Sequence, residues 1–212
     1  MNREPFATGE FYHIYNRGVD KRAIFLDDDD RDRFLQSMVV FNMQEAVGSI
    51  YEHINDVKLG RQKDVTALVD IVCYCLNPNH YHFVLRERAE SGISEFMRRI
   101  GGYTKYFNIK HHRSGTLFQS RYQSKYISSN EYLLHLSAYV NLNWRVHQLG
   151  SSTSKSSWGE YMGANGGEIC SKEIILKQFK NNTEYREFAE SSLKDILEHK
   201  ERSREFAKLM LE

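Results

Sequence analysis

Two histidines separated by one residue, His80 and His82, stand directly after a turn signal in the sequence. The turn is predicted by Asn77-Pro78-Asn79, because proline presets φ and asparagine tolerates tight backbone geometry. The flanking runs are short, β-branched and aromatic, which predicts two strands joined by this turn over residues 70–87. Alternate residues of a strand share a face, so both imidazoles would point to one side and could form half of a metal site. The same pair also fits a turn cap beside an ordinary surface histidine.

Cys73 and Cys75 alternate within the apolar run that precedes this turn. Together with His80 and His82 they could form a structural zinc site, although such sites usually place the cysteine pair in a knuckle and not inside a strand. The alternative is a pair of buried thiols in a reducing compartment. The sequence contains no signal peptide and no long apolar run, so we expect a cytoplasmic protein that does not span a membrane.

A second polar pattern lies in a helix predicted over residues 130–147. The apolar side chains Leu133, Leu136, Val140 and Trp144 recur at helical spacing and predict its buried stripe. A neighbouring stripe with the same spacing is polar, and it consists of Tyr132, His135, Tyr139 and Asn143. Tyr139 and Asn143 are one turn apart, so they can face the same point. A tyrosine on a helix is more often part of the core or its rim.

The segment from Glu95 to Tyr126 is basic, with seven Lys or Arg and one acidic residue, a local net charge of 7 − 1 = +6. Aromatic residues are interleaved with these charges. Basic residues neutralise phosphates and aromatic rings stack on bases, so the segment suits single-stranded nucleic acid. By composition alone, a solvated helix face over an aromatic core fits equally well. The basic residues are Arg98, Arg99, Lys105, Lys110, Arg113, Arg121 and Lys125.

The elements that would position these residues follow an order of strand, helix, insertion, strand-turn-strand, helix, strand and helix. We therefore predict an α+β fold, a ferredoxin-like split βαβ antiparallel sheet with helices on one face, within a main domain of residues 1–150. The insertion covers about residues 43–69. Four aspartates, Asp27 to Asp30, could bind a metal but more often supply the cap and first turn of a helix.

Length and charge set the remaining limits. The chain has 212 residues, 41% of them hydrophobic, and a formal net charge of +1, so it is a folded protein whose global charge says nothing about partners. Residues 151–157 are rich in serine and predict a polar linker. Residues 158–212 show helical periodicity and predict a helical C-terminal extension.

Several motifs together resemble a known family. The run from Pro78 to Phe83 is similar to the Pro-Asn-His-x-His signature of single-tyrosine HUH transposases (IS200-like). The runs 12–18, 113–122 and 139–143 resemble the REP-associated tyrosine transposases, a domesticated branch of that family. The resemblance covers about residues 9–147, with a weaker echo at 156–161. Two features depart from the family: the long insertion, and Trp144 where a proline usually ends the helix.

The resemblance implies the HUH endonuclease fold and a set of roles. His80 and His82 would bind Mg²⁺ or Mn²⁺, Asn143 would add an oxygen ligand, and Tyr139 would be the nucleophile. The implied activity is cleavage and transfer of single-stranded DNA at REP-like palindromic hairpins through a 5′-phosphotyrosine. The DNA would be held by Arg17, Arg98, Arg99, Lys105, Arg113, Arg121 and Lys125.

Alternatives remain open at this point. A DNA- or RNA-binding regulator could keep this fold without catalysis. Tyr132 is the second candidate for the nucleophile, and His135, one turn before Tyr139, is a candidate base. The sequence leaves the oligomeric state open between monomer and homodimer. The resemblance also implies association with the nucleoid of a prokaryote.

Overall fold

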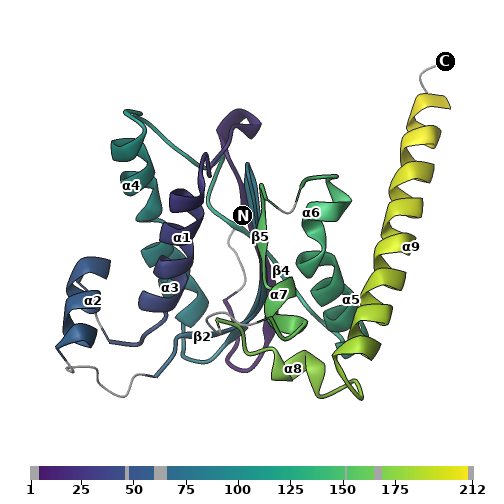
Figure 1. Cartoon of the computed structure of the whole chain (residues 1–212), viewed down its shortest axis with the longest axis horizontal. Coiled ribbons are helices and arrows are strands. Elements are labelled where there is room, and N and C mark those ends of the chain that lie inside the picture. Colours follow the sequence, from purple (N-terminus) through teal and green to yellow (C-terminus); the bar gives the residue numbers. More distant parts are fainter. Residues whose placement is uncertain (1–4, 46–47, 60–65, 151, 165–168, 210–212) are drawn as a thin grey trace.

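Five strands form one antiparallel sheet that stands between two layers of helices (Figure 1). The computed structural model describes residues 5–45, 48–59, 66–150, 152–164 and 169–209. The strand order is β4-β1-β3-β2-β5. The strands are β1 (Phe11–Arg17), β2 (Val69–Asn77), β3 (His80–Glu87), β4 (Gln123–Tyr126) and β5 (Lys155–Ser156).

The first four strands and their connecting helices make the predicted split βαβ arrangement. The helices α1 (Asp28–Val40) and α3 (Gly92–Ile100) lie side by side on one face of the sheet, with α2 (Ile50–Lys58) and α4 (Tyr103–Lys110) beside them (Figure 1). Phe34 of α1 packs against Tyr81 and Phe83 of β3, with ring centroids 5.6 and 6.2 Å apart. The α+β, ferredoxin-like prediction is therefore confirmed for this half of the molecule.

Asp27 caps α1, because its side chain accepts a hydrogen bond from the backbone N–H of Asp30 at 2.9 Å. The four aspartates thus begin a helix, as their position before an apolar stripe predicts. The insertion contains α2, and its residues 46–47 and 60–65 lie outside the described part of the chain. A short 3-10 turn, Val19–Lys21, follows β1.

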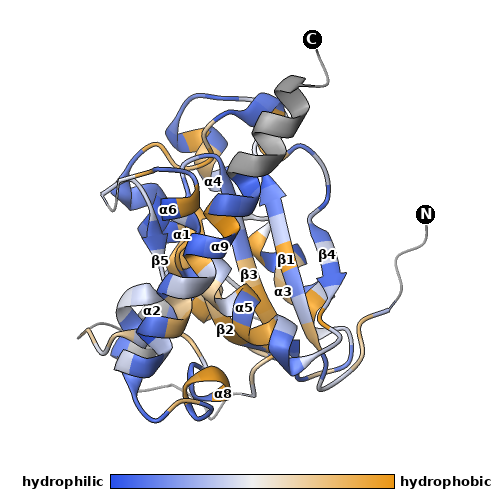
Figure 2. Ribbon diagram, turned by 90° about the vertical axis from the view of Figure 1, so that its right-hand side faces the viewer, coloured by the Kyte–Doolittle hydropathy of each residue, from blue (hydrophilic) through white to orange (hydrophobic). Residues whose placement is uncertain are grey.

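The second face of the sheet is also covered, which corrects the expectation of helices on one face. Here lie α5 (Asn130–Asn141) and α6 (Asn143–Val146), and behind them α9 (Asn182–Leu209) (Figure 1). All nine residues of β2 are buried, as expected for a strand with both faces covered. Hydrophobic residues accordingly gather on the central strands (Figure 2).

The segment predicted as a polar linker contains β5, which pairs with β2 at the sheet edge, so that prediction was wrong. Ser157 follows β5, and its hydroxyl donates to Asn141 of α5 at 2.6 Å. Tyr185 of α9 is fully buried and accepts a hydrogen bond from the same Asn141 at 2.9 Å. The predicted helical extension is present as α7 (Trp158–Tyr161), α8 (Glu173–Leu176) and α9, and it packs on α5. Within the described residues, no helix is both long and apolar enough to cross a membrane.

Candidate active site

Strand pairing gathers the chemically active side chains on the α5 face of the sheet. His80 and His82 of β3 share this face, because alternate residues of a strand point the same way. On β1, Arg17 lies opposite His80 and Tyr15 lies opposite His82. The next residue of β1 on that face, His13, therefore lies beside the pair.

The His80 ring is held in one tautomer. Its Nδ1 lies 2.6 Å from Oδ1 of Asn79, an oxygen that can only accept, while the Nδ2 of Asn79 donates to the Lys21 carbonyl at 3.0 Å. Nδ1 therefore carries the ring proton, and the lone pair of Nε2 points toward Asn143 and Asn77. This is the form of histidine that binds a metal ion.

The His80 Nε2 and the Asn143 Oδ1 converge at a distance of 3.2 Å. Both atoms accept hydrogen bonds from the Asn77 amide, at 2.9 and 2.7 Å. The Asn77 amide thus bridges the two acceptor atoms, and a divalent cation bound by both would take the place of that bridge. The Asn143 Nδ2 is buried without a hydrogen-bond partner, but this atom is a donor, and the lone pairs that would hold a cation belong to the His80 Nε2 and the Asn143 Oδ1. The donor set therefore fits a hard divalent cation.

His82 is oriented by a second histidine. Its Nδ1 lies 2.9 Å from the Nε2 of His13, so one of these two nitrogens donates to the other. The rings are stacked with centroids 5.1 Å apart. When His82 donates from Nδ1, its Nε2 lone pair is available to a cation, and His13 holds that tautomer in place.

The histidines of this cluster are held neutral. Burial, with the nearby charge of Lys125, lowers the pKa of His13 to about 4. Burial lowers the pKa of His80 to about 4 as well, and it places the pKa of His82 well below its usual value, with neighbouring histidines adding to the effect. Neutral imidazoles near pH 7 are ready to act as metal ligands.

Tyr139 of α5 reaches the same place from the opposite wall. Its ring meets the His82 ring edge to face, with centroids 5.7 Å apart. Burial raises the pKa of Tyr139, and the Asn143 amide and the Arg17 guanidinium act against that rise. Asn143 follows one helical turn later, after Leu142 separates α5 from α6. The spacing seen in the sequence thus brings both side chains to one point.

The other members of the predicted polar stripe point elsewhere. The ring of Tyr132 lies 5.1 Å from the Lys125 ammonium. The Nδ1 of His135 is 2.9 Å from the Ser192 hydroxyl of α9, and its ring packs on Phe188. His135 therefore faces the C-terminal helix, which argues against its expected role as the base for Tyr139.

An open pocket of about 500 Å³ is lined by His80, His82 and Tyr139, whereas Asn143 is fully buried and does not line it. Among the residues the structure describes, no acidic side chain lines it, which suits an anionic ligand. Its lining consists of Tyr15, Asn16, Arg17, His80, His82, Gln119, Ser120, Gln123, Tyr139 and His147.

The predicted DNA-binding cations do not all meet at this pocket. Arg17 lines it, and Lys125 projects from β4 on the same face, opposite His13. Arg98, Arg99 and Lys105 belong to α3 and α4, the helices on the other face. Arg113 and Arg121 lie in the connection between α4 and β4.

Arg99 has a structural environment that sequence reasoning could not foresee. Its guanidinium pairs with Glu95 at 2.6 Å and donates to the Met43 carbonyl at 2.6 Å and the Glu45 carbonyl at 3.1 Å. These contacts tie the insertion to α3. The side chain is only 12% exposed, so it contributes little to a DNA-binding surface.

The zinc alternative finds no support in the geometry. Cys73 and Cys75 are buried, and burial raises both thiol pKa values, that of Cys75 to about 12. Zinc binds thiolates, but these two cysteines do not join His80 and His82 in any group of three ligand atoms within 4.8 Å of one another, as far as the structure describes the chain. Within the described residues, the one group of three close His, Cys, Asp or Glu ligands lies elsewhere, at Asp27, Asp30 and His111.

That group is occupied by a side chain of the protein. The Lys110 ammonium lies 2.7 Å from an Asp27 oxygen and 3.1 Å from an Asp30 oxygen, and His111 is 2.9 Å from Asp30. The ammonium already supplies the positive charge that a metal ion would bring. The cluster therefore links the start of α1 to the end of α4 through ion pairs.

Sequence reasoning missed three residues of the site: His13, Asn77 and His147. The His147 ring lies 4.7 Å from the His80 ring, and it follows Asn143 by one further helical turn. That spacing was a usable signal, as was the alternation of His13 with Tyr15 and Arg17 along β1. Asn77 carried no signal beyond its place in a turn.

Comparisons with known proteins show the family of this chain. No curated protein matches the chain. A solved structure described as "Structure of the REP associates tyrosine transposase bound to a REP hairpin" is similar at 13% identity, with a TM-score of 0.48, over 81% of this chain and 93% of that chain. Residues 12–143 match the family model described as "Transposase IS200 like". That match spans more than half of the chain and contains His80, His82, Tyr139 and Asn143, and the protein belongs to the IS200-like transposase family.

Proposed function

We propose that the protein is a metal-dependent single-strand DNA endonuclease and strand transferase, which acts at palindromic repeat hairpins through a 5′-phosphotyrosine intermediate. One observation carries the proposal: Tyr139 stands against His82 in a pocket that His80 also lines, and the His80 Nε2 and the buried Asn143 Oδ1 converge at 3.2 Å. A nucleophile beside a cation-binding donor set, in a pocket without acidic lining, suits attack on a phosphodiester. The choice of hairpin repeats rests on the sequence motifs shared with the REP-associated branch.

His80, His82 and Asn143 would hold the cation, Mg²⁺ or Mn²⁺. When bound, this ion withdraws negative charge from the scissile phosphate. Two imidazole nitrogens and one amide oxygen leave coordination positions open to phosphate and water, and this mixed set suits Mn²⁺ at least as well as Mg²⁺. His13 and Asn79 would act by fixing the tautomers of the two ligating rings.

Tyr139 would attack the phosphorus atom. The new bond joins the phenolic oxygen to phosphorus, and the bond from phosphorus to the 3′-oxygen breaks. The phenol loses one proton and the leaving 3′-oxygen gains one, so the step is neutral in protons. Arg17 and the Asn143 amide support the phenolate, because both act to lower the pKa of Tyr139. Attack by a 3′-hydroxyl from another DNA end reverses the step and joins the strands.

The uncovered part of the α5 face would carry the DNA strand. The Tyr15 side chain is 37% exposed there, and Gln123 and Lys125 of β4 are exposed beside it. An exposed aromatic ring among cationic and amide groups is the usual surface for single-stranded nucleic acid.

A search for the covalent adduct tests this proposal. The protein is incubated with Mn²⁺ and oligonucleotides that carry palindromic hairpins with single-stranded extensions, and the products are analysed by mass spectrometry. We expect a DNA fragment attached to Tyr139. Tyr139→Phe should bind the DNA but form no adduct, and Tyr132→Phe, the matched control on the same helix, should form it. An adduct at Tyr132 would overturn the assignment, and binding without any adduct would favour the regulator.

A further inference from the structure

A second pocket opens on the opposite face of the sheet, beneath α3, close to the active-site pocket. Its volume is about 260 Å³, roughly half that of the active-site pocket. Phe118 and Tyr122 form its aromatic wall together with Met97, and Arg98 and Arg121 stand at its rim. We name it the Phe118 pocket.

The two pockets meet at an irregularity of the sheet edge. Tyr15 pairs with Gln123, and Gly18 pairs with Phe118, so two residues of β1 lie opposite four residues, 119–122, of the edge segment. Extra residues of this kind form a bulge, which redirects side chains. Gln119 accordingly lines the active-site pocket, while Arg121 and Tyr122 line the Phe118 pocket.

Two residues belong to both pockets. Asn16 and Ser120 line each of them, and the Asn16 Nδ2 donates to the Ser120 carbonyl at 3.0 Å. A strand that passes over this contact would connect the two pockets directly. A nucleotide next to the one at Tyr139 could therefore place its base in the Phe118 pocket.

The chemistry of the Phe118 pocket suits a nucleobase. Its wall is aromatic, its rim carries two guanidinium groups, and among the described residues no carboxylate lines it. The Arg98 guanidinium donates to both oxygens of Glu95 at 2.7 Å, so its charge is balanced within the chain. Arg121 is exposed, and within the described part of the chain no carboxylate lies within 4 Å of it. Of the two cations at the rim, Arg121 is therefore the one available to a phosphate.

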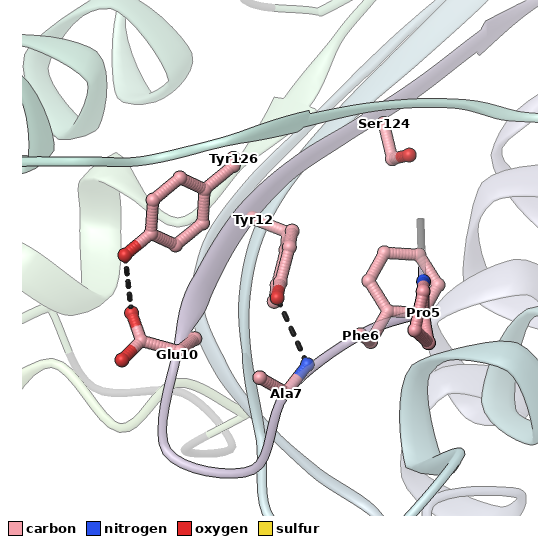
Figure 3. A pocket seen from close by; sticks show the side chains of 7 residues that line it. All are labelled: Pro5, Phe6, Ala7, Glu10, Tyr12, Ser124 and Tyr126. Carbon is pink, nitrogen blue, oxygen red and sulfur yellow. Dashed lines mark hydrogen bonds between the residues drawn. The ribbon is translucent and has the colours of Figure 1, made fainter. Parts of the chain in front are cut away.

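A third pocket, near the N-terminus, is also lined by aromatic side chains but differs from the Phe118 pocket in the charged groups around it. Phe6, Tyr12 and Tyr126 surround that third pocket, but the Glu10 carboxylate enters it and accepts a hydrogen bond from Tyr126 at 2.8 Å (Figure 3). A carboxylate repels a phosphate chain, and no arginine or lysine lines the pocket. Aromatic side chains alone therefore do not single out the Phe118 pocket.

We propose that the Phe118 pocket is a nucleobase subsite, which takes one unstacked base of the single strand whose phosphate lies in the active-site pocket. The base would stack on Phe118, Arg121 would contact a neighbouring phosphate, and the Asn16 amide would border the base edge. This inference rests on the proposed function, because it assigns part of the same substrate.

An abasic scan tests the subsite. All proteins carry Tyr139→Phe, so that binding is measured without cleavage. Fluorescein-labelled DNA hairpins have a single-stranded extension, 5′ or 3′, and a single abasic nucleotide is moved along the extension while anisotropy reports the Kd. We expect one position where the abasic nucleotide weakens binding by about 5- to 100-fold, the loss typical of one stacked base. With Phe118→Ala added, the same abasic nucleotide should cost less than about twofold, since the stack is already absent.

Two controls keep the result specific. Phe6→Ala removes a ring from the pocket in Figure 3 and should leave the abasic profile unchanged. Arg121→Gln alters an exposed side chain without risk to the core and should reduce the salt slope of binding by about 0.7, whereas Arg186→Gln on α9 should not change it.

A flat abasic profile, or a penalty that persists in Phe118→Ala, would overturn the subsite. This outcome is separate from the fate of the catalytic proposal. A profile that depends on Phe118, without an adduct at Tyr139 in the parent protein, would leave the subsite standing and remove the catalysis. An adduct at Tyr139 together with a flat abasic profile would support the catalysis and remove the subsite.

Discussion

The two faces of strand β3 use burial for different ends. On one face Tyr81 and Phe83 stack with centroids 4.8 Å apart and pack on α1, where apolar contact needs no partner. On the other face His80 and His82 are almost as buried, yet every ring lies against polar neighbours and an open pocket. Alternate residues of one strand therefore separate stability from chemistry. Phe83, at the centre of the first face, should respond to substitution through unfolding, whereas the second face should respond through activity.

The largest effect is expected from His82→Ala. Loss of one of two imidazole ligands should reduce DNA cleavage about a thousandfold or more while the protein stays folded. The measurement is adduct formation per folded molecule in Mn²⁺, with circular dichroism as the check on folding. An active His82→Ala protein would contradict the assignment of this face to chemistry.

Phe83→Ala probes the opposite face of the same strand. Removing a fully buried ring should lower the free energy of unfolding by about 3–5 kcal/mol. Urea denaturation followed by circular dichroism measures this loss. At low temperature, where the variant is folded, its Mn²⁺ affinity should match that of the parent, and a large fall in affinity would show that the two faces are coupled.

His13→Gln tests whether a neighbour of His82 supports metal binding on the histidine face of β3. His13 contacts His82 without being a proposed ligand, so its replacement should weaken Mn²⁺ binding by about 10- to 100-fold. Isothermal titration calorimetry gives the affinity. His13→Ala, which offers no group to the His82 Nδ1, should bind Mn²⁺ no better than His13→Gln. Equal affinity in parent and variants would mean that His13 only fills space.

The smallest expected effect, for each ring and each pH unit, is the acid sensitivity of the metal-free protein. The folded-state pKa of His13 and of His80 is about 4, below the value of about 6.5 expected in the unfolded chain. Between these values the unfolded chain binds more protons, so stability is complete above pH 6.5 and falls toward pH 4, by about 1 kcal/mol per pH unit for each ring.

Denaturation in EDTA at several pH values measures this dependence, and His13→Gln supplies the comparison. The difference between the slopes isolates His13 from the carboxylates that titrate in both proteins. The variant should lose stability less steeply on acidification than the parent. Identical slopes would show that the His13 ring is not held neutral by the fold.

The elements of the fold were predictable where the signal is local. The Asn-Pro-Asn turn, the two strands and the aspartate cap of α1 appear as expected. The second layer of helices was not foreseen. The apolar stripe of α5 predicts that one side of the helix is buried, but the face of the sheet that it covers depends on its contacts with β2 and β3. Strand β5 was missed because a serine-rich segment has no strand signal of its own. It forms a strand here because it pairs with the edge of β2.

By itself, the sequence determined which side chains share a face. The period of a strand places His80 beside His82, and the period of a helix places Tyr139 beside Asn143. Only the tertiary structure decided which faces meet. Pairing of β1 with β3 brought His13 to His82, and packing against α9 turned His135 away from Tyr139. The physical reason is that periodicity is a property of the local backbone, whereas contacts between distant segments depend on how all the apolar faces are buried together.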